Sequence, residues 1–548
     1  MKNLRWVLNF VAFLTLAVCA QAGGSQGYVV SGSVVDYMTG QPLPSMSVTL
    51  TSDKQGGSSQ STFSGKSGQF TFASVAAGKY ILSGSGPGYR AQGLNQHGNF
   101  FTGVAVGPDL DATKVVFRMQ RDASIQGQVI DEQNEPVRNA TVQLFMVDDS
   151  LGVRRVIVET NAGANDQGTY HFSHLAPGTY YVAVSARPWY AQYQPQHGAR
   201  SQPGDGESAA RVQEEAAQLD VAYPFTFYPD AIDSSQASAI TLQPGDRATA
   251  DITLHAVPAT HLRIRNDGAP QSGPAPGLKQ RIFDGLLIPV FGSTVFGYSQ
   301  GVYEVGGLAP GHYVVELNRA AAGNEPGGRG WFRDVDVYGD MEISAADSPA
   351  MATVTGLVVY EGAPAPRGSV YVALHNRDSG EEWSSEVSDK GLFGLQENEL
   401  RPGTYEAALY GAQKWLITRI VAQNAKVQGL EITLAPGATA KLVFTATHVS
   451  ATVTGTVMRG DEPLPGALVL LVPEDAAHHT ELYRRDQSDS DGTFTLPQVP
   501  PGRYTAVAIQ NGWTLDWGNA NVIEPYLAKG EKITITGDKS TDLKLQAQ

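Results

Sequence analysis

The stretch that decides the fold is Gly492-Thr-Phe494-Thr-Leu496, followed after four intervening residues by Pro501-Gly502-Arg-Tyr504. The chain repeats this phrase, and the other four copies begin at Gly68, Gly168, Gly301 and Gly391. The two glycines of a copy lie ten residues apart in four copies and twelve in the copy at Gly391. Successive copies begin about 90 to 135 residues apart. Repetition at the length of a domain predicts a string of similar modules.

The residues around the last copy predict short strands joined by tight turns. Apolar and polar residues alternate from Ala451 to Val457, and further strand-like segments follow at 467–472, 504–508, 532–535 and 542–545. About seven strands in roughly a hundred residues favour an antiparallel β-sandwich of immunoglobulin-like type. The Pro-Gly pair predicts a type II turn with a positive φ at the glycine. The tyrosine that follows is expected to bury its ring and to hydrogen-bond back across the corner.

Four short patterns recur in order along the modules: Gly-x-Val, Pro-x-x-x-Ala-x-Val, Asp-x-x-Gly-x-Phe and Leu-x-Pro-Gly-x-Tyr. Together they resemble the carboxypeptidase regulatory-like domain. The resemblance implies a transthyretin-like (prealbumin-like) sandwich, frequently strung in tandem in secreted bacterial proteins. Its motifs are structural, so the resemblance implies a fold and no activity. We expect an all-β chain with modules at 27–121, 122–257, 258–350 (degenerate), 351–448 and 449–548, and one short helical insertion at about 206–218.

The N-terminus has the pattern of a secretory signal. Lys2 and Arg5 precede an apolar run, and the small residues Ala20 and Ala22 suit a signal peptidase, so residues 1–22 are expected to be cleaved. The alternative is a lipoprotein in which Cys19 is acylated, although Val18 is unusual before such a cysteine. Both interpretations place the protein outside the cytoplasm, either secreted, in the periplasm or on the outer cell surface.

Composition narrows the classes of partner. The formal net charge is −15, which argues against nonspecific binding to nucleic acid or anionic lipid. No second apolar run approaches 18 residues, so we expect no transmembrane segment in the mature chain. The single cysteine is Cys19, and cleavage after residue 22 would remove every thiol. Disulfides and thiolate metal sites are then excluded.

Signatures of catalysis are weak. His478-His479-Thr-Glu481 contains the His-x-x-Glu of zinc carboxypeptidases, but no histidine follows it to complete a zinc site. Asp489 and Asp491 precede Gly492 in a pattern that resembles part of a calcium loop, and hairpin-turn chemistry explains the same residues. We therefore expect no enzyme, no cofactor and no metal.

Exposed aromatic loops are the remaining candidates for a ligand site. Aromatic faces stack on sugar rings, and neighbouring amides and carboxylates bond the hydroxyls. The candidate ligand-binding residues are Trp513, Trp517, Asn511, Asp516, Asn519, Trp189, Tyr190, Tyr193 and Tyr228. The alternative is that these aromatics seal contacts between modules or cap the cores.

The sequence thus predicts a stiff rod of five modules, because the junctions at 119–124 and 448–451 are short and poor in glycine and proline. The leading hypothesis is a secreted, non-enzymatic protein that binds carbohydrate or cell-envelope glycan. The alternative is a structural spacer or a scaffold that binds other envelope proteins.

Overall fold

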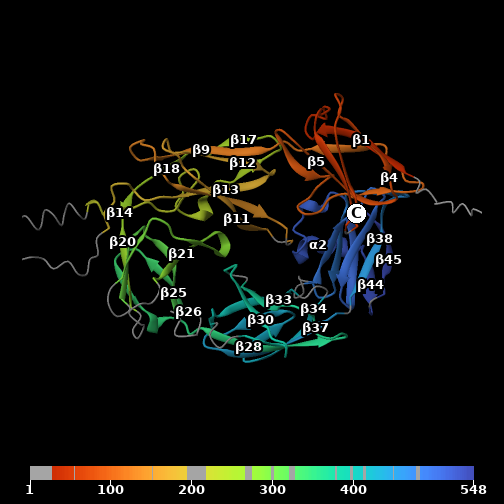
Figure 1. Ribbon diagram of the computed structural model, residues 1–548. Helices are drawn as coiled ribbons and strands as arrows, with labels where there is room; N and C mark the ends of the chain where they lie inside the picture. Colours follow the sequence, from red (N-terminus) through yellow and green to blue (C-terminus); the bar gives the residue numbers. More distant parts are fainter. Residues whose placement is uncertain are drawn as a thin grey trace, which may run out of the picture.

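The computed structural model describes residues 27–54, 56–150, 152, 154–193, 218–265, 275–297, 302–319, 328–376, 379–394, 399–411, 415–448, 450–476, 482–537 and 539–548. The expected signal segment lies outside them, as does the expected helix at about 206–218 except for Gln218. The described chain forms five β-sandwiches in tandem (Figure 1), as the repeats predict. Each sandwich encloses a hydrophobic core of its own, so each module is held by its own packing.

Modules 1 and 2 each pair two sheets. In module 1, the first sheet has the order β4 (Gln69–Val75), β1 (Tyr28–Asp36), β8 (Val115–Met119), and the second has β3 (Ser59–Phe63), β2 (Ser47–Ser52), β5 (Gly78–Gly86), β6 (Tyr89–Gly93), with β7 (Val104–Val106) also on β5. In module 2, the first sheet has β12 (Thr169–Leu175), β9 (Ala123–Asp131), β17 (Arg247–Thr249) and β18 (Ile252–Leu254). The second has β11 (Arg155–Gly163), β10 (Thr141–Asp148), β13 (Gly178–Ser185), β15 (Thr226–Phe227) and β16 (Ile240–Leu242), beside a 3-10 turn η1 (Ser234–Gln236).

Module 3 follows a small ribbon of β14 (Val221–Ala222) and β19 (Val257–Pro258). Its sheets are β23 (Thr294–Gly297), β24 (Val302–Leu308), β20 (Thr260–Arg265), β27 (Met341–Ser344), and β22 (Leu286–Pro289), β21 (Gly277–Ile282), β25 (Gly311–Arg319), β26 (Gly328–Val337). Two 3-10 turns, η2 (Phe283–Gly285) and η3 (Ala345–Asp347), complete it. The degenerate middle repeat therefore still folds as a sandwich.

Modules 4 and 5 repeat the plan. In module 4, the first sheet has β31 (Leu392–Phe393) and β32 (Glu399–Leu400) paired with β28 (Ala352–Glu361), followed by β37 (Thr439–Thr447) and β34 (Leu416–Gln423). The second sheet has the order β30 (Glu382–Val387), β29 (Val370–Asn376), β33 (Gly403–Tyr410), β36 (Glu431–Leu434), β35 (Lys426–Gln428). Module 5 has β39 (Glu462–Pro463), β38 (Ala451–Arg459), β42 (Thr493–Val499) and β45 (Thr541–Gln546), facing β41 (Arg484–Gln487), β40 (Leu468–Pro473), β43 (Gly502–Ile509), β44 (Glu531–Ile535). Module 5 also contains η5 (Gly512–Thr514), in the stretch expected to be a loop, and the helix α2 (Ala520–Leu527), which was not expected.

The first strand of each module explains the Gly-x-Val opening. This strand lies between the strand of the repeated phrase, which is antiparallel to it, and the last strand of the module, which is parallel to it. A Cβ added at Gly32 would meet the carbonyl oxygen of Val115 at 2.0 Å, and one at Gly455 would meet that of Leu543 at 2.3 Å. Glycine is present there because the last strand approaches too closely for a side chain.

The repeated tyrosine makes the same bond in every module. Its hydroxyl donates to the carbonyl four residues earlier, at 2.5 to 3.0 Å; the tyrosines are Tyr80, Tyr180, Tyr313, Tyr405 and Tyr504. This confirms the predicted corner. The type II turn is wrong for module 5, because Gly502 has no positive φ and Gln498, four residues earlier, takes a φ of 55°. There β42 carries an irregular residue, and the left-handed conformation lies in that bulge.

The junction between modules 1 and 2 is anchored to module 1 through a buried carboxylate. Arg121 lies between β8 and β9, and its Nε donates to Asp36 Oδ2 at 2.6 Å. The hydroxyl of Tyr89 donates to the same oxygen at 2.8 Å, and the carboxylate of Asp36 is buried. These bonds to Arg121 and Tyr89 hold the pKa of Asp36 well below its usual range, although burial alone would raise it.

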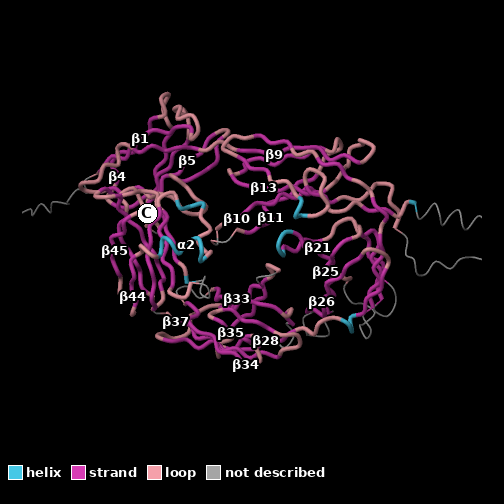
Figure 2. Tube along the Cα trace, turned by 180° about the vertical axis from the view of Figure 1, so that it is seen from behind, coloured by secondary structure: helices cyan, strands magenta, loops and turns pink. Residues whose placement is uncertain are grey.

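The predicted rod is wrong, because the five modules close into a ring. Figure 1 follows the chain from module 1 at the upper right, through modules 2 and 3 on the left and module 4 below, to module 5 beside module 1. Figure 2 shows the same closed path from behind. Stiff junctions preserve an angle at every step, so short connections are as compatible with a ring as with a rod. The turn motifs of the repeats carry no information on those angles.

Candidate functional site: the contact between the first and last modules

The contact that closes the ring, here called the closure interface, joins parts of the chain 385 to 416 residues apart in sequence. Module 1 contributes the start of β5 and the segment 95–105 around β7. Module 5 contributes the end of β41, the turn after it and η5, so its residues lie within 485–490 and at 513. The interface is therefore built from loops and strand ends on both sides.

Asp489 is the charged residue at the centre of this interface. It begins the tight turn between β41 and β42, where its N–H donates to the carbonyl of Thr493 at 2.8 Å. Its carboxylate points away from the turn. One oxygen accepts the N–H of Gly103 at 2.9 Å, and the other lies 2.5 Å from Nζ of Lys79. A charge-assisted pair of bonds thus ties the turn of module 5 to module 1.

Ser490 extends the same attachment along the edge of a sheet. Its N–H donates to the carbonyl of Gly103 at 2.9 Å, and its Oγ accepts the N–H of Ala105 at 2.9 Å. Ala105 lies in β7, which pairs with β5 alone. The turn of module 5 therefore covers main-chain groups that an edge strand would otherwise leave open.

A buried amide makes several hydrogen bonds across the interface. Gln487 is 1% exposed, and its Nε2 donates to the carbonyl of Asn95 at 2.8 Å and to Oγ1 of Thr102 at 2.9 Å. Its Oε1 lies 3.0 Å from Nδ1 of His97. The bonds of this amide all cross between modules, so separation would leave a buried polar group to be resolvated.

Aromatic rings cover one side of these hydrogen bonds. Trp513 stacks on His97 with ring centroids 4.9 Å apart and an angle of 5°, and it lies 5.5 Å from Phe100. The guanidinium of Arg485 lies over Phe100 at 4.8 Å and over Trp517 at 5.0 Å. Burial lowers the pKa of both His97 and Arg485. The rings therefore contribute apolar and cation–π contact where the polar bonds meet.

The tip of the β10–β11 hairpin of module 2 joins the same region of module 5. The N–H of Gly518 donates to the carbonyl of Gly152 at 2.7 Å, and Arg154 lies 3.4 Å from Asp516. A Cβ at Gly152 would meet the ring of Trp517 at 2.6 Å, so this hairpin tip touches the tryptophan directly. Module 5 is thus held by modules 1 and 2 together.

Burial changes the pKa of two carboxyl groups in module 5. It raises the pKa of Asp489, and the ion pair with Lys79 opposes that rise. Burial also raises the pKa of Asp486 to about 6, although this carboxylate accepts main-chain bonds from Gln487 and Thr495. Both carboxylates are held by protein donors, which is the arrangement of a structural contact.

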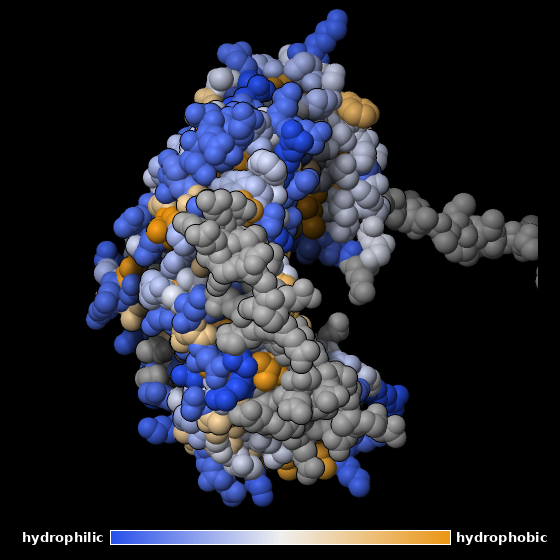
Figure 3. Space-filling view, turned by 90° about the vertical axis from the view of Figure 1, so that its left-hand side faces the viewer, coloured by the Kyte–Doolittle hydropathy of each residue, from blue (hydrophilic) through white to orange (hydrophobic). Residues whose placement is uncertain are grey.

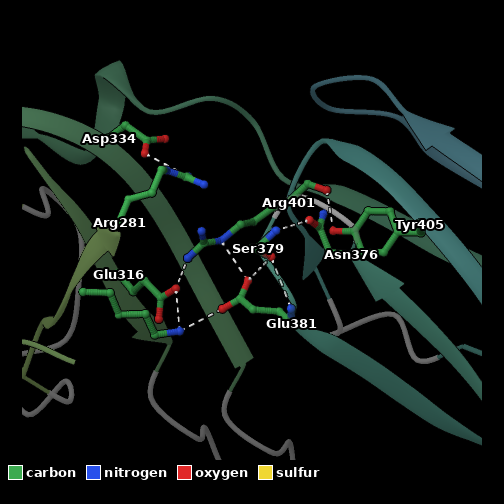
Figure 4. A network of polar contacts seen from close by, with 9 residues as sticks. Arg281, Glu316, Asp334, Asn376, Ser379, Glu381, Arg401 and Tyr405 are labelled. Carbon is green, nitrogen blue, oxygen red and sulfur yellow. Dashed lines mark hydrogen bonds and ion pairs between the residues drawn. The ribbon is translucent and has the colours of Figure 1, made fainter. Parts of the chain in front are cut away.

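A second contact between modules is a network of buried charges (Figure 4). Arg401 of module 4 pairs with Glu316 of module 3, and its Nε lies 3.4 Å from Glu381. Lys279 bridges the same two carboxylates at 3.2 and 2.8 Å. The guanidinium of Arg401 also lies 4.5 Å from the ring centroid of Phe332. Two positive and two negative groups therefore neutralise one another between modules 3 and 4.

The environment of Arg401 shows how deeply this network is placed. Its side chain is 5% exposed, and burial lowers its pKa to about 10. Its carbonyl accepts the hydroxyl of Tyr405, the corner tyrosine of module 4. The repeated corner thus fixes the main chain from which this inter-module arginine extends.

Modules 2 and 3 meet through an apolar cluster and a buried histidine. Phe283 of η2 lies 5.4 Å from Phe145 and 5.4 Å from Phe227. His261 is 4% exposed, with Nε2 at 2.7 Å from Asp220 and Nδ1 at 3.0 Å from Glu304. Burial alone would lower the pKa of His261, but the hydrogen bonds and charges of these acids outweigh it and raise the pKa.

The structure engages three of the first group of sequence candidates in contacts, and the other two, Asn511 and Asn519, are exposed. Trp517 is 8% exposed and packs with Tyr483 in a core beside α2, so the expectation of an exposed loop is wrong for this residue. Trp513 is half-buried against His97, and its Nε1 donates to Gly466. Asp516 faces Arg154. The remaining two have structural positions: Asn519 caps α2, and Asn511 takes a left-handed conformation before η5.

The second group is spread over module 2. Tyr193 is buried and lies against Gly307 of module 3, under the guanidinium of Arg187. Tyr228 is half-buried and packs against the core of module 2. Trp189 is 88% exposed, with Tyr190 edge-on at 5.7 Å. The structure therefore does not gather these aromatics into one surface.

The aspartates considered as metal ligands are engaged in contacts with other protein groups. Asp489 is engaged by Lys79, and Asp491 accepts the hydroxyl and the N–H of Thr493 within its own turn. Within the described residues, no group of three potential ligands is placed to hold a metal ion. The His478–Glu481 motif lies outside the described residues.

Residues 29–120 and 124–212 each match the family model of the carboxypeptidase regulatory-like domain. The two matches confirm the resemblance for the first two modules and cover about a third of the chain. No curated protein matches the chain. No helix among the described residues has the length and apolar character to cross a bilayer.

Solved structures with detectable likeness include the Bacillus anthracis TIE protein, at 12% identity over 96% of this chain and 75% of that chain, with a TM-score of 0.17. A double mutant of the shaft pilin SpaA from Lactobacillus rhamnosus GG matches 42% of this chain and 98% of its own at 11% identity, with a TM-score of 0.20. The minor pilin GBS52 of Streptococcus agalactiae matches 42% and 97% at 12% identity, with a TM-score of 0.20. TM-scores this low carry no argument about the arrangement or role of this chain.

Proposed function

We propose that the protein is a non-enzymatic scaffold of the cell exterior, held as a closed ring by contacts between its own modules. The observation that carries the proposal is the carboxylate of Asp489, which bonds Lys79 and the main chain of Gly103 in a module 386 to 410 residues away. A charged group used in this way fixes the relative position of two folded modules.

The use of other reactive side chains supports the same role. Arg401, Glu316, Glu381 and Lys279 are committed to one another between modules 3 and 4. Trp513, the strongest sugar-stacking candidate by sequence, stacks on His97 instead. Several residues that could otherwise bind a ligand are thus engaged in contacts between modules.

The surface suits a molecule surrounded by water. In the face drawn in Figure 3, hydrophilic residues predominate and hydrophobic ones are scattered. The net charge of −15 favours solubility and disfavours anionic partners. Together with the signal-like N-terminus, this surface supports a location in the periplasm, at the cell surface or outside the cell.

The scaffold is tested by small-angle X-ray scattering on the mature chain. The parent is expected to give the compact profile of a ring, and Asp489→Arg, which places a cation beside Lys79, is expected to increase the radius of gyration. Asn165→Ala changes the equivalent turn of module 2 and serves as the matched control. A parent that scatters as an extended rod would refute the closed scaffold.

A second proposal is a glycan site at Trp189. This indole is 88% exposed, and Tyr190 beside it lies 3.3 Å from Glu132 through its hydroxyl. An open ring face next to polar groups suits stacking on a sugar. If the site exists, Trp189→Ala should remove binding on a glycan array, whereas Tyr338→Ala, at a 75% exposed tyrosine of module 3, should not. An array without binding by the parent would refute it.

A further inference from the structure

We infer that the two faces of the closure interface also bind in trans, so that the partner of an opened ring is a second copy of this chain. The module 1 face carries Lys79, Thr102 and Gly103, and the module 5 face carries Gln487 and Asp489. The inference rests on the proposed scaffold in one respect, since it takes this contact as the one that closes the ring.

The two faces differ from each other, and each chain carries one of each. Such a heterologous contact closes a ring when both faces belong to one chain and builds a head-to-tail row when they belong to different chains. The same bonds serve both cases, because the faces meet without a covalent link between them and without a shared strand in the described sheets.

Opening the ring does not require unfolding of either terminal module. The core of module 1 is built from β1 to β8, and the core of module 5 from β38 to β45. Neither core includes a residue of the other module. A face that is released therefore stays folded and ready to bind.

The module 5 face is distinctive among the repeats of this chain. At the position of Asp489, module 2 has Asn165 and module 4 has Ser388, and both side chains accept N–H groups of their own turn. Neither residue has a carboxylate to offer to Lys79, and the aspartates of these turns, Asp166 and Asp389, stand one position later, where module 5 has Ser490. The module 1 face is thus expected to select module 5 of either the same chain or another copy.

Closure within one chain normally wins because the linked faces meet at an effective concentration on the order of 1 mM. The trans contact becomes visible when each chain can use only one face. Gly103→Leu blocks the module 1 face, because an added Cβ would meet Asp489 Oδ1 at 2.6 Å and the three atoms nearest to it all belong to Asp489. Asp489→Arg blocks the module 5 face.

The experiment mixes these two full-length variants. Each alone is expected to be a monomer with a larger hydrodynamic radius than the parent. The equimolar mixture is expected to form a heterodimer with twice the mass of one chain and nothing larger, since its remaining faces are both blocked. Sedimentation velocity at protein concentrations up to about 1 mM measures the mass.

Controls separate the possible failures. Far-UV circular dichroism and thermal unfolding show that each variant is folded, and a mixture of Gly103→Leu with Asn165→Ala should stay monomeric because the second chain remains closed. Expanded monomers that do not pair would overturn the trans contact and leave the closed scaffold standing. Variants as compact as a compact parent would overturn the inference by showing that this contact does not close the ring. A parent as expanded as the variants would refute the scaffold itself.

Discussion

Two turns of the molecule share a backbone and differ in what their first side chain binds. The turn at Asn165 in module 2 and the turn at Asp489 in module 5 each close with the first N–H donating to the carbonyl four residues on. Asn165 Oδ1 also accepts the N–H groups of Gln167 and Thr169, so this side chain is satisfied inside its turn. In module 5, Asp491 accepts one such N–H, and Asp489 reaches module 1.

The difference teaches that a turn can keep its fold while its side chain is released for assembly. The repeated glycine, Gly168 in one turn and Gly492 in the other, has a φ of 72° and 75°. The main chain thus forms this turn with either side chain at the first position. A change at that one position converts a local turn into a joint between modules.

The largest effect is expected where the charge that links two modules is buried most deeply. Arg401→Ala should leave Glu316 and Glu381 with Lys279 alone and destabilise the contact of modules 3 and 4 by about 3–5 kcal/mol. Hydrogen exchange along β26 and β33 would register the loss. Arg333→Ala removes a more exposed pair with Asp347 and should cost less than about 1 kcal/mol. Equal effects would remove the distinction between buried joints and surface pairs.

The comparison of the two turns is tested most directly by replacing the first residue of each turn with alanine. Asp489→Ala should weaken closure by about 1–3 kcal/mol, because Lys79 and the N–H of Gly103 lose their acceptor at a partly exposed site. Asn165→Ala should lower the unfolding free energy of module 2 by about 1 kcal/mol and leave the shape unchanged. Small-angle X-ray scattering measures the change in closure, and urea unfolding measures the change in unfolding free energy. A shape change in Asn165→Ala would contradict the division of roles.

The contact between modules 2 and 3 at His261 is expected to make a pH-dependent contribution to stability. Its folded pKa is raised above 6.5 by Asp220 and Glu304, so its contribution to stability is complete below pH 6.5 and is lost as the pH rises through the raised value. The advantage of the parent over His261→Gln in thermal unfolding should therefore shrink with increasing pH. An advantage that stays constant across that range would show that the histidine is neutral in the folded protein.

The smallest effect is expected at the corner tyrosine, which makes the same hydrogen bond in modules 2 and 5. Tyr180→Phe and Tyr504→Phe each remove one corner hydrogen bond and should cost about 1 kcal/mol in the module concerned. Neither should alter the radius of gyration, because the corner makes no bond between modules. Chemical unfolding of the two variants would reveal unequal costs if the repeated corner were used differently in the two modules.

The sequence predicted most of the features that depend on neighbours in the chain. The alternating strands, the turn glycines and the corner tyrosine are local, and the five sandwiches follow from them. The helix α2 escaped notice because it has eight residues and contains Pro525. The bulge at Gln498 was missed for a similar reason, since a left-handed residue outside glycine and asparagine has no clear signature.

The closure interface could not be predicted by the same means, because Asp489 finds its partners 386 and 410 residues away. The only signal was disagreement among the copies: Asp489 stands where the turns of modules 2, 4 and 1 have Asn165, Ser388 and Gly65. The expectation of a ligand site at Trp513 and Trp517 was unreliable for a related reason. An aromatic in a polar loop suits a ligand and a module contact equally, and only the positions of the modules decide between them.

The closed ring also determines how the molecule would carry tension. Module 1 begins at Tyr28, and Gln548 at the other end is bonded to Ala508 within module 5, so both ends of the described chain belong to modules that touch. A pull on the two ends therefore loads the Lys79–Asp489 contact before the junctions of the intervening modules. When that contact and the contact of the β10–β11 hairpin tip with module 5 have both parted, the chain lengthens while all five sandwiches remain folded, so the force that extends the ring is set by two small contacts.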